Sequence, residues 1–279
     1  MSKVWFVTGA GSGIGAGTVN AVLAAGDSVV ATGRNVEKLR GAFRGAAEDK
    51  LEILRLDVAD EAQALRAVDR AVQKFGRIDV VLNNAGYCLV GNFEELSTQE
   101  MERQFATNFW GTSHVMRAAL PVMREQRSGH IINISSVAGV AGMKHCGAYG
   151  ASKFAVEGLS LAVAEEVEKF GIKVTVVEPG FFRTALLDAA NVKWPHHRLD
   201  DYAAVEASAQ EMLSPYAGKQ PGDPEKLGQV LVKLVNMETA PRLFVAGADA
   251  IAMIAPAVQA RLDAVHALED LSKSTAGNF

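Results

Sequence analysis

The sequence of 279 residues is poor in cysteine: it contains only Cys88 and Cys146, which lie far apart in the chain. Two such cysteines make no disulfide framework, and neither has a second cysteine at metal-ligand spacing. No uninterrupted apolar run reaches the ~18 residues that span a bilayer, and the N-terminus lacks the regions of a signal peptide. We therefore expect a soluble cytoplasmic protein with no membrane partner.

An excess of basic residues is also missing. Lysine and arginine number 28 against 32 aspartate and glutamate residues, which gives a net charge of −4. No basic cluster is present, so nucleic acid is not expected as a partner. Hydrophobic residues make up 49% of the chain and charged residues 22%, which indicates a sizeable core rather than disorder. Without an internal repeat or a linker, residues 1–279 are expected to form a single domain.

Short apolar runs alternate with longer amphipathic stretches along the chain. The runs predict seven strands, at residues 4–7, 29–32, 51–56, 79–82, 130–134, 173–177 and 242–245. Helices are predicted between the strands, and a capping box of Ser97 and Glu100 marks the start of a long one. Nearly all-apolar strands joined by helical crossovers indicate a doubly wound α/β fold, with a parallel sheet of about seven strands and helices on both faces.

Two segments depart from this alternation of strands and helices. Residues 183–222 form a long, irregular stretch, and such stretches in compact domains often cover active sites as lids. Apolar side chains are frequent in and just before it: Phe181, Phe182, Leu186, Leu187, Trp194, Tyr202, Met212 and Leu213. If they cover a pocket, they predict a hydrophobic ketone, aldehyde or secondary alcohol as substrate; alternatively, they only pack the lid onto the core. Residues 248–279 are expected to form a helical tail packed at an edge.

A glycine-rich turn follows the first predicted strand and opens the first predicted helix. Its glycines, Gly9, Gly13 and Gly15, have the spacing Gly-x-x-x-Gly-x-Gly, which differs from the common Gly-x-Gly-x-x-Gly fingerprint. Glycines let the backbone approach a pyrophosphate, and the helix N-terminus adds unpaired N–H groups and a partial positive charge. The turn is therefore predicted to bind the phosphates of a dinucleotide.

The residues after the second predicted strand indicate which dinucleotide is bound. In dinucleotide folds an acidic residue there binds the ribose 2′-hydroxyl of NAD, whereas an arginine accommodates the 2′-phosphate of NADP. This chain has Gly33 and Arg34 at that place, and Lys38 lies one helical turn further on. A guanidinium can bind a phosphate through two parallel hydrogen bonds, so NADP(H) is predicted in preference to NAD(H).

Tyr149 and Lys153 are four residues apart, which places them on one face of a helix, one turn from each other. Because a nearby ammonium favours the phenolate, we expect Lys153 to lower the pKa of Tyr149 and make it a general acid and base. Ser135 and Ser136 follow the fifth predicted strand, at the edge of a parallel sheet where ligands bind. A serine hydroxyl there can hold a carbonyl oxygen that Tyr149 protonates.

Six motifs, in order along the chain, resemble those of the short-chain dehydrogenase/reductase family in its single-domain branch. They are Thr8–Gly15, Asn83-Asn84-Ala85-Gly86, Asn108 in Thr-Asn-Phe-Trp-Gly, Asn133-Ile134-Ser135-Ser136, Tyr149-Gly150-Ala151-Ser152-Lys153 and Pro179-Gly180. The resemblance spans residues 3–184 and implies hydride transfer between a nicotinamide cofactor and a carbonyl or alcohol. It also implies a homo-oligomer, a dimer or tetramer, built from the helices near residues 98–120 and 148–170.

The same resemblance implies roles for single residues. Tyr149 would be the acid/base, Lys153 would lower its pKa and hold the nicotinamide ribose, and Ser136 would orient the substrate. Asn108 would hold a water of the proton relay. The implied cofactor contacts are Gly9, Ser12, Gly13, Ile14, Gly15, Arg34, Asp57, Val58, Asn84, Tyr149, Lys153, Pro179, Phe182 and Thr184.

Two other functions on the same fold are kept as alternatives. An isomerase or dehydratase would use a bound nicotinamide without net turnover, but such relatives carry a Gly-x-x-Gly-x-x-Gly turn and a larger C-terminal domain, which this chain lacks. A cofactor-sensing protein would have damaged catalytic residues, whereas Asn108, Ser136, Tyr149 and Lys153 are all present. No metal is expected, since the cofactor supplies the hydride, and nothing near either cysteine in the sequence indicates an activated thiolate.

Overall fold

The computed structural model describes residues 2–184, 186, 192–202 and 219–277. Its strands are β1 Val4–Val7, β2 Ser28–Gly33, β3 Leu51–Arg55, β4 Val80–Asn83, β5 Gly129–Ile134, β6 Ile172–Pro179 and β7 Leu243–Ala246. Its α-helices are α1 Gly13–Ala24, α2 Val36–Ala42, α3 Glu61–Phe75, α4 Thr98–Phe105, α5 Gly111–Gln126, α6 Gly147–Val167, α8 Pro224–Val235, α9 Ala248–Ala267 and α10 Glu269–Lys273. Shorter turns are η1 Phe93–Glu95, η2 Ala106–Trp110, η3 Val137–Gly139, η4 Glu168–Phe170 and η6 Asp200–Tyr202.

The seven strands form one parallel sheet in the order β3-β2-β1-β4-β5-β6-β7. The chain runs outward from β1 to β3 on one side and then from β4 to β7 on the other. The strand order therefore reverses between β1 and β4, and ligands of such sheets bind at that point, beyond the carboxyl ends of the strands. The predicted doubly wound fold is confirmed.

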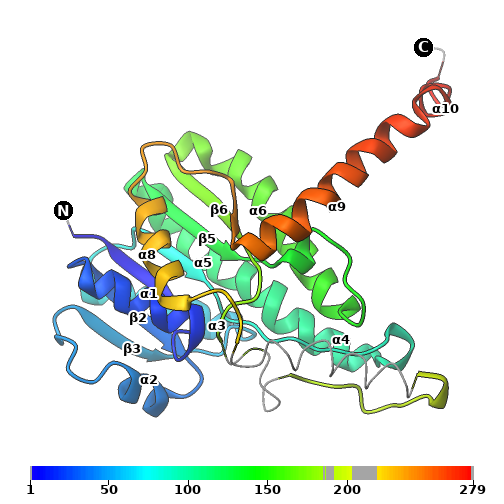
Figure 1. Ribbon diagram of the computed structural model, residues 1–279. Coiled ribbons are helices and arrows are strands. Elements are labelled where there is room, and N and C mark those ends of the chain that lie inside the picture. The colour runs from blue at the N-terminus through cyan, green and yellow to red at the C-terminus, as the bar shows by residue number, and fades with distance from the viewer. Residues whose placement is uncertain (1, 185, 187–191, 203–218, 278–279) are drawn as a thin grey trace.

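Helices cover both faces of the sheet (Figure 1). Phe6 of β1 packs into the core formed with α3, α5 and α6, whereas its neighbours Trp5 and Val7 pack into the core formed with α1, α2 and α8. Side chains alternate between the two faces of a strand, so a strand covered on both sides must be apolar at every position. This is why the central strands appear in the sequence as uninterrupted apolar runs.

The long helix predicted from residue 97 begins as expected but is not continuous. Ser97 accepts a hydrogen bond from the backbone N–H of Glu100, and the Glu100 carboxylate accepts one from the backbone N–H of Ser97, which completes the predicted capping box. The helix then passes through the π-helical turn η2 before it continues as α5. Turns of this kind are rare and occur frequently at functional sites. The turn was not predicted from the sequence.

The C-terminal tail is helical, as predicted, but its expected packing at an edge holds only for its beginning. Ala250 and Ile254 of α9 are buried against Val137 of η3. Beyond them α9 and α10 extend away from the rest of the protein (Figure 1), and apolar side chains such as Leu262 and Val265 are exposed. Among the described residues, α9 included, no helix combines the length and apolarity needed to cross a bilayer.

Most of the predicted lid, with Leu187, Met212 and Leu213, lies outside the described residues. Its described beginning and middle contact the body of the protein. Leu186 and Trp194 pack against a buried cluster that contains Tyr149. The Tyr202 hydroxyl donates a 2.9 Å hydrogen bond to the carboxylate of Glu94.

Candidate active site

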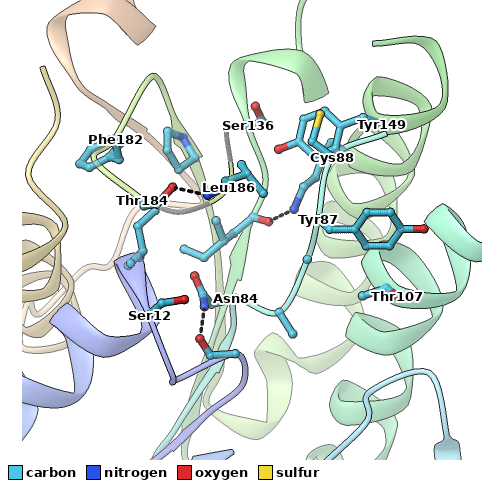
Figure 2. A pocket seen from close by; sticks show the side chains of 18 of the residues that line it. Ser12, Asn84, Tyr87, Cys88, Thr107, Ser136, Tyr149, Phe182, Thr184 and Leu186 are labelled. Carbon is cyan, nitrogen blue, oxygen red and sulfur yellow. Dashed lines mark hydrogen bonds between the residues drawn. The ribbon is translucent and has the colours of Figure 1, made fainter. Parts of the chain in front are cut away.

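A pocket of about 460 Å³ opens at the carboxyl edge of the sheet, where the strand order reverses. It is lined by the turn after β1, by the ends of β2, β4, β5 and β6, and by α6. Every residue predicted to act in catalysis or cofactor binding lines this pocket, except Gly15 and Asn108. Figure 2 shows Ser136 and Tyr149 at one end of the pocket and Ser12 with Asn84 toward the other.

The glycine-rich turn has the conformation that a phosphate-binding loop needs. Gly13 has a φ of 56°, in the left-handed region that side chains disfavour. The side chain of Asn84 donates hydrogen bonds of 3.0 and 3.1 Å to the carbonyls of Thr8 and Gly9, which fixes the turn to the end of β4. Gly15 does not line the pocket, and it must be a glycine because a Cβ there would be 2.4 Å from the Gly9 carbonyl oxygen. Its cofactor contact stays a prediction.

Two cationic side chains line the pocket where the second strand ends. Asn35 accepts a 2.9 Å hydrogen bond from the backbone N–H of Lys38 and so begins α2, which brings Lys38 back toward Arg34. Within the described part of the chain neither side chain forms an ion pair. Asp57 and Val58, just after the neighbouring strand β3, also line the pocket. Arg34 and Lys38 therefore give this end of the pocket a positive charge.

The segment after β6 closes the other side of the glycine-rich turn. Pro179, Phe182 and Thr184 line the pocket, and a Cβ at Gly13 would be 2.8 Å from the methyl group of Thr184. The backbone N–H of Phe181 donates a 2.6 Å hydrogen bond to Asp249, in the first turn of α9. The beginning of the C-terminal tail therefore holds this segment in place, a contact that the sequence analysis missed.

The Tyr149 hydroxyl faces the Ser136 hydroxyl at the end of β5. Ser136 accepts a 3.2 Å hydrogen bond from the backbone N–H of Ala138, which orients its side chain. Burial raises the pKa of Tyr149 above its ordinary value, and a hydrogen bond with Ser136 opposes part of the rise. The direction is opposite to the one predicted from the sequence. Desolvation of the phenolate is the largest cause and the neighbouring thiols Cys88 and Cys146 raise the pKa further, so the hydroxyl holds its proton at neutral pH.

Lys153 lies one turn after Tyr149, as predicted, and is also buried. Its Nζ donates a 2.7 Å hydrogen bond to the carbonyl of Ile134 and lies 5.8 Å from the centre of the Tyr149 ring. Burial lowers the pKa of Lys153 to about 8. The ammonium is therefore fixed beside the phenol ring and is still mostly charged at neutral pH.

Asn108 does not line the pocket but lies behind it, in the π-helical turn η2. Its side chain donates hydrogen bonds of 3.1 Å to the carbonyl of Tyr87 and to the Ser152 hydroxyl, and it accepts one of 3.2 Å from the Tyr87 backbone. A Cβ at Gly86 would lie 3.2 Å from its oxygen and 3.8 Å from the Nζ of Lys153. Asn108 thus joins the loop after β4 to α6, next to the lysine.

The sequence analysis missed an ionisable residue directly behind Lys153. Glu157, one further turn along α6, is 9% exposed, and burial raises its pKa to about 7. The Ser135 hydroxyl and the Lys153 ammonium lower that pKa, while Glu178 of β6 raises it. A Cβ at Gly139 would touch Ser135, Lys153 and Glu157 together, which shows how closely the three side chains meet. The four-residue spacing from Lys153 was the available signal.

The wall around Tyr149 is mostly apolar. Cys88, Val90, Ala138, Cys146 and Val192 form a buried cluster with its ring, against which Met143, Leu186 and Trp194 pack. Six of these neighbours line the pocket: Cys88, Val90, Ala138, Met143, Cys146 and Leu186. A substrate carbonyl placed at the two hydroxyls would therefore carry its substituents into an apolar space.

Together, the parallel sheet, the glycine-rich turn at its point of reversal and the buried tyrosine–lysine pair define a dinucleotide-binding oxidoreductase. The family model of the short chain dehydrogenases matches residues 3–193, and the chain belongs to this family.

Three comparisons place it among known members. A 3-ketodihydrosphingosine reductase of Bacteroides thetaiotaomicron is 36% identical over 239 residues, which cover 86% of each chain. A short-chain dehydrogenase from Streptomyces avermitilis has a similar structure, with a TM-score of 0.88 and 35% identity over 99% of this chain and 100% of the other. The structure of ElxO with NADP bound matches with a TM-score of 0.72 and 28% identity over 88% and 97% of the two chains. The protein is thus an NAD(P)-dependent dehydrogenase or reductase.

Proposed function

We propose that the protein is an NADPH-dependent reductase of apolar ketones or aldehydes, which also catalyses the reverse oxidation of a secondary or primary alcohol. The observation that carries this proposal is the pair of hydroxyls, on Tyr149 and Ser136, that meet against an apolar wall of the pocket.

The two hydroxyls and the lysine have distinct roles in this reaction. A bound nicotinamide would supply the hydride to the carbonyl carbon. The Ser136 hydroxyl would hold the carbonyl oxygen, and Tyr149 would give its proton to that oxygen as negative charge develops. Because burial keeps Tyr149 protonated, the acid is ready before the substrate binds. The Lys153 ammonium, fixed beside the ring, would then stabilise the phenolate that remains.

The preference for NADP(H) rests on Arg34 and Lys38. Both line the pocket at the end of β2, and in the ranges that the structure describes neither is paired with a carboxylate. Two unpaired cations at one place favour a ligand with an additional phosphate over one with a hydroxyl. The Ser12 hydroxyl and the N-terminus of α1 would bind the pyrophosphate.

The substrate class rests on the lining of the pocket. Val90, Met143 and Leu186, which line the pocket near the two hydroxyls, have no side-chain hydrogen-bonding groups, and such a wall disfavours sugars and phosphorylated carbonyls. The name of the Bacteroides relative, which denotes reduction of a keto group on a sphingoid compound, supports a long apolar carbonyl. Leu186 and Trp194 pack beside Tyr149, which supports the predicted role of residues 183–222 as a lid.

The experiment is a substrate panel that follows the absorbance of NADPH with purified protein. It compares aliphatic, aromatic and sphingoid ketones with sugars and phosphorylated carbonyls, and it repeats the best substrate with NADH. We expect net oxidation of NADPH and the highest kcat/KM with the longer apolar ketones. Better turnover of small polar carbonyls would refute the substrate class. Tight cofactor binding without turnover of any carbonyl would refute the reductase itself and favour a cofactor sensor.

We also propose that the protein assembles as a homodimer or homotetramer through α5, α6 and the turn η2. Trp110, Phe154 and Leu161 are large apolar side chains exposed on these elements, and such patches favour association. Size-exclusion chromatography with light scattering tests the proposal. An oligomer that becomes smaller in the variant Phe154→Glu supports it, and a monomeric wild-type protein refutes it.

A further inference from the structure

The two cysteines of the chain, far apart in sequence, meet in the wall of the pocket. Cys88 lies in the loop after β4, and Cys146 is the N-cap residue of α6. The two residues belong to one buried cluster, in which each side chain shifts the pKa of the other, and both line the pocket. In Figure 2 the sulfur of Cys88 lies next to Tyr149. A small reagent that enters the pocket can therefore reach both sulfur atoms.

The backbone holds the two cysteine segments alongside each other. Gly91 donates a 2.8 Å hydrogen bond to the carbonyl of His145, and Gly91 and Cys146 form an isolated parallel bridge. The side chain of Asn92 is 2.9 Å from Nδ1 of His145. The loop packing therefore holds the two cysteine residues near each other.

The two thiols are chemically different. Cys146 stands at the N-terminus of a helix of 21 residues, where the partial positive charge favours a thiolate. The interaction between the two thiols lowers the pKa of Cys146, and the same interaction together with burial raises the pKa of Cys88. Cys146 is thus suited to attack an electrophile, with Cys88 beside it as a protonated thiol that can resolve the product. This arrangement replaces the expectation that neither cysteine is activated.

We propose that Cys88 and Cys146 form a reactive dithiol, which a hydroperoxide that enters the pocket converts into an intramolecular disulfide. The Cys146 thiolate attacks the terminal oxygen of the hydroperoxide; an S–O bond forms, the O–O bond breaks, and the leaving oxygen takes up a proton as an alcohol or water. Cys88 then attacks the resulting sulfenic sulfur; the S–S bond forms, the S–O bond breaks, and water leaves with the proton of Cys88. The hydroperoxide is reduced by two electrons, and the two thiols are oxidised.

The disulfide alters the catalytic end of the pocket. Its sulfur atoms must approach each other to roughly 2.05 Å, which draws Cys88 toward α6. Cys88 lies between Tyr87, whose carbonyl accepts the hydrogen bond of Asn108, and Leu89, whose N–H donates a 2.8 Å hydrogen bond to Gln104. The shift therefore disturbs the loop that joins Asn108 to the site. Because small displacements of positioned groups slow catalysis, we expect a loss of turnover of roughly tenfold or more. This consequence rests on the proposed reductase function, whereas the disulfide does not.

The test treats the purified full-length protein with hydrogen peroxide and then blocks free thiols before mass spectrometry. We expect the intact chain to lose two hydrogen atoms, a cross-linked peptide pair that contains Cys88 and Cys146, and full reversal by dithiothreitol. Two unmodified thiols, or a disulfide between two chains, would overturn the proposal. Carbonyl reduction measured in parallel should fall with the mass change and recover with dithiothreitol. If no carbonyl is reduced at all, the mass spectra still show whether the two cysteines form a disulfide.

The variants Cys88→Ala and Cys146→Ala separate the two roles. In Cys88→Ala the sulfenic acid of Cys146 has no thiol to resolve it, so peroxide should produce an adduct with dimedone. In Cys146→Ala the remaining Cys88 should stay unmodified under the same conditions. Circular dichroism checks that both variants are folded. Equal dimedone labelling of the two variants would contradict the assigned order of attack.

Discussion

The Nζ of Lys153 donates its hydrogen bond to a backbone carbonyl at the end of β5, 2.7 Å away, and lies 5.8 Å from the centre of the Tyr149 ring. The lysine is therefore held by the sheet and not by the tyrosine hydroxyl. Burial acts on the two groups in opposite directions: it raises the pKa of Tyr149 and lowers that of Lys153 to about 8. Both shifts favour the neutral forms. The phenol of Tyr149 therefore keeps its proton, and the adjacent ammonium of Lys153 loses a proton more readily than a free lysine.

The first prediction concerns the acid itself. Tyr149→Phe removes the hydroxyl while keeping the ring in its buried cluster, so turnover should fall by roughly a hundredfold or more. The Kd for NADPH, measured by fluorescence titration, should change little. Tyr87→Phe is the matched control, because Tyr87 also lines the pocket but contributes only its backbone to the network described above. Comparable losses in both variants, or retained activity in Tyr149→Phe, would contradict the assigned role.

A second prediction tests the packing beneath the glycine-rich turn. In Gly15→Ala the new Cβ would lie 2.4 Å from the Gly9 carbonyl oxygen and 2.6 Å from the Asn84 side chain, so the turn must move. We expect a loss of about 1–3 kcal/mol in the free energy of unfolding and weaker NADPH binding. Chemical denaturation and fluorescence titration measure the two effects.

Gly11→Ala is the control for the stability effect. A Cβ at Gly11 meets only the Lys38 and Leu39 side chains, at 3.6 Å or more, which is an ordinary contact distance. Its free energy of unfolding should stay within about 0.5 kcal/mol of the wild type. If Gly15→Ala were as stable as Gly11→Ala, the inferred rigidity of the turn would be wrong.

The third prediction concerns the choice of cofactor. Arg34→Ala should raise the KM for NADPH by roughly tenfold to a hundredfold, because hydrogen bonds to a charged phosphate contribute about 1.5–3 kcal/mol. The KM for NADH should change far less, since NADH has no phosphate at that position. Arg40→Ala is the control: Arg40 lies on α2, the short helix that follows Arg34, but it pairs with Glu37 at 2.8 Å and does not line the pocket. Equal effects on NADPH and NADH would refute the preference for NADP(H).

The fold could be predicted from the sequence because its signals are local. The central strands are buried on both faces, so they contain apolar runs, of which Val4–Val7 is apolar throughout. The capping box of Ser97 and Glu100 involves residues three positions apart, and the Tyr149–Lys153 pair is one helical turn long. Interactions of this kind are visible in a short window of sequence.

What could not be predicted depends on contacts between distant segments. The direction of the Tyr149 pKa shift follows from burial by residues as far away as Cys88, and a four-residue spacing alone suggested the opposite sign. The meeting of the two thiols depends on how the loop after β4 packs beside α6. The π-helical turn that carries Asn108, and the departure of α9 from the body, likewise have no short-range signal. The roles of the pocket residues toward a cofactor stay predictions.

The last prediction concerns the pH dependence of stability. Glu157 has a folded pKa of about 7 against an ordinary value of 4.5, because burial disfavours its charged form. Between these two values the folded protein retains a proton that the unfolded chain has released. The contribution of this group to stability is therefore complete below about pH 4.5, declines as the pH rises, and is lost above about pH 7. At about 1.4 kcal/mol per unit of pKa, it amounts to at most about 3 kcal/mol.

Glu157→Gln removes the titration and keeps the shape of the side chain. The free energy of unfolding, measured by urea denaturation at intervals across this pH range, should decline less steeply toward neutral pH in the variant than in the wild type. Glu166→Gln, an exposed position on the same helix, should keep the wild-type slope. If Glu157→Gln also kept that slope, Glu157 would have to be ionised throughout the range. The buried ammonium of Lys153 would then have a carboxylate partner one turn away, and its own pKa would be higher than about 8.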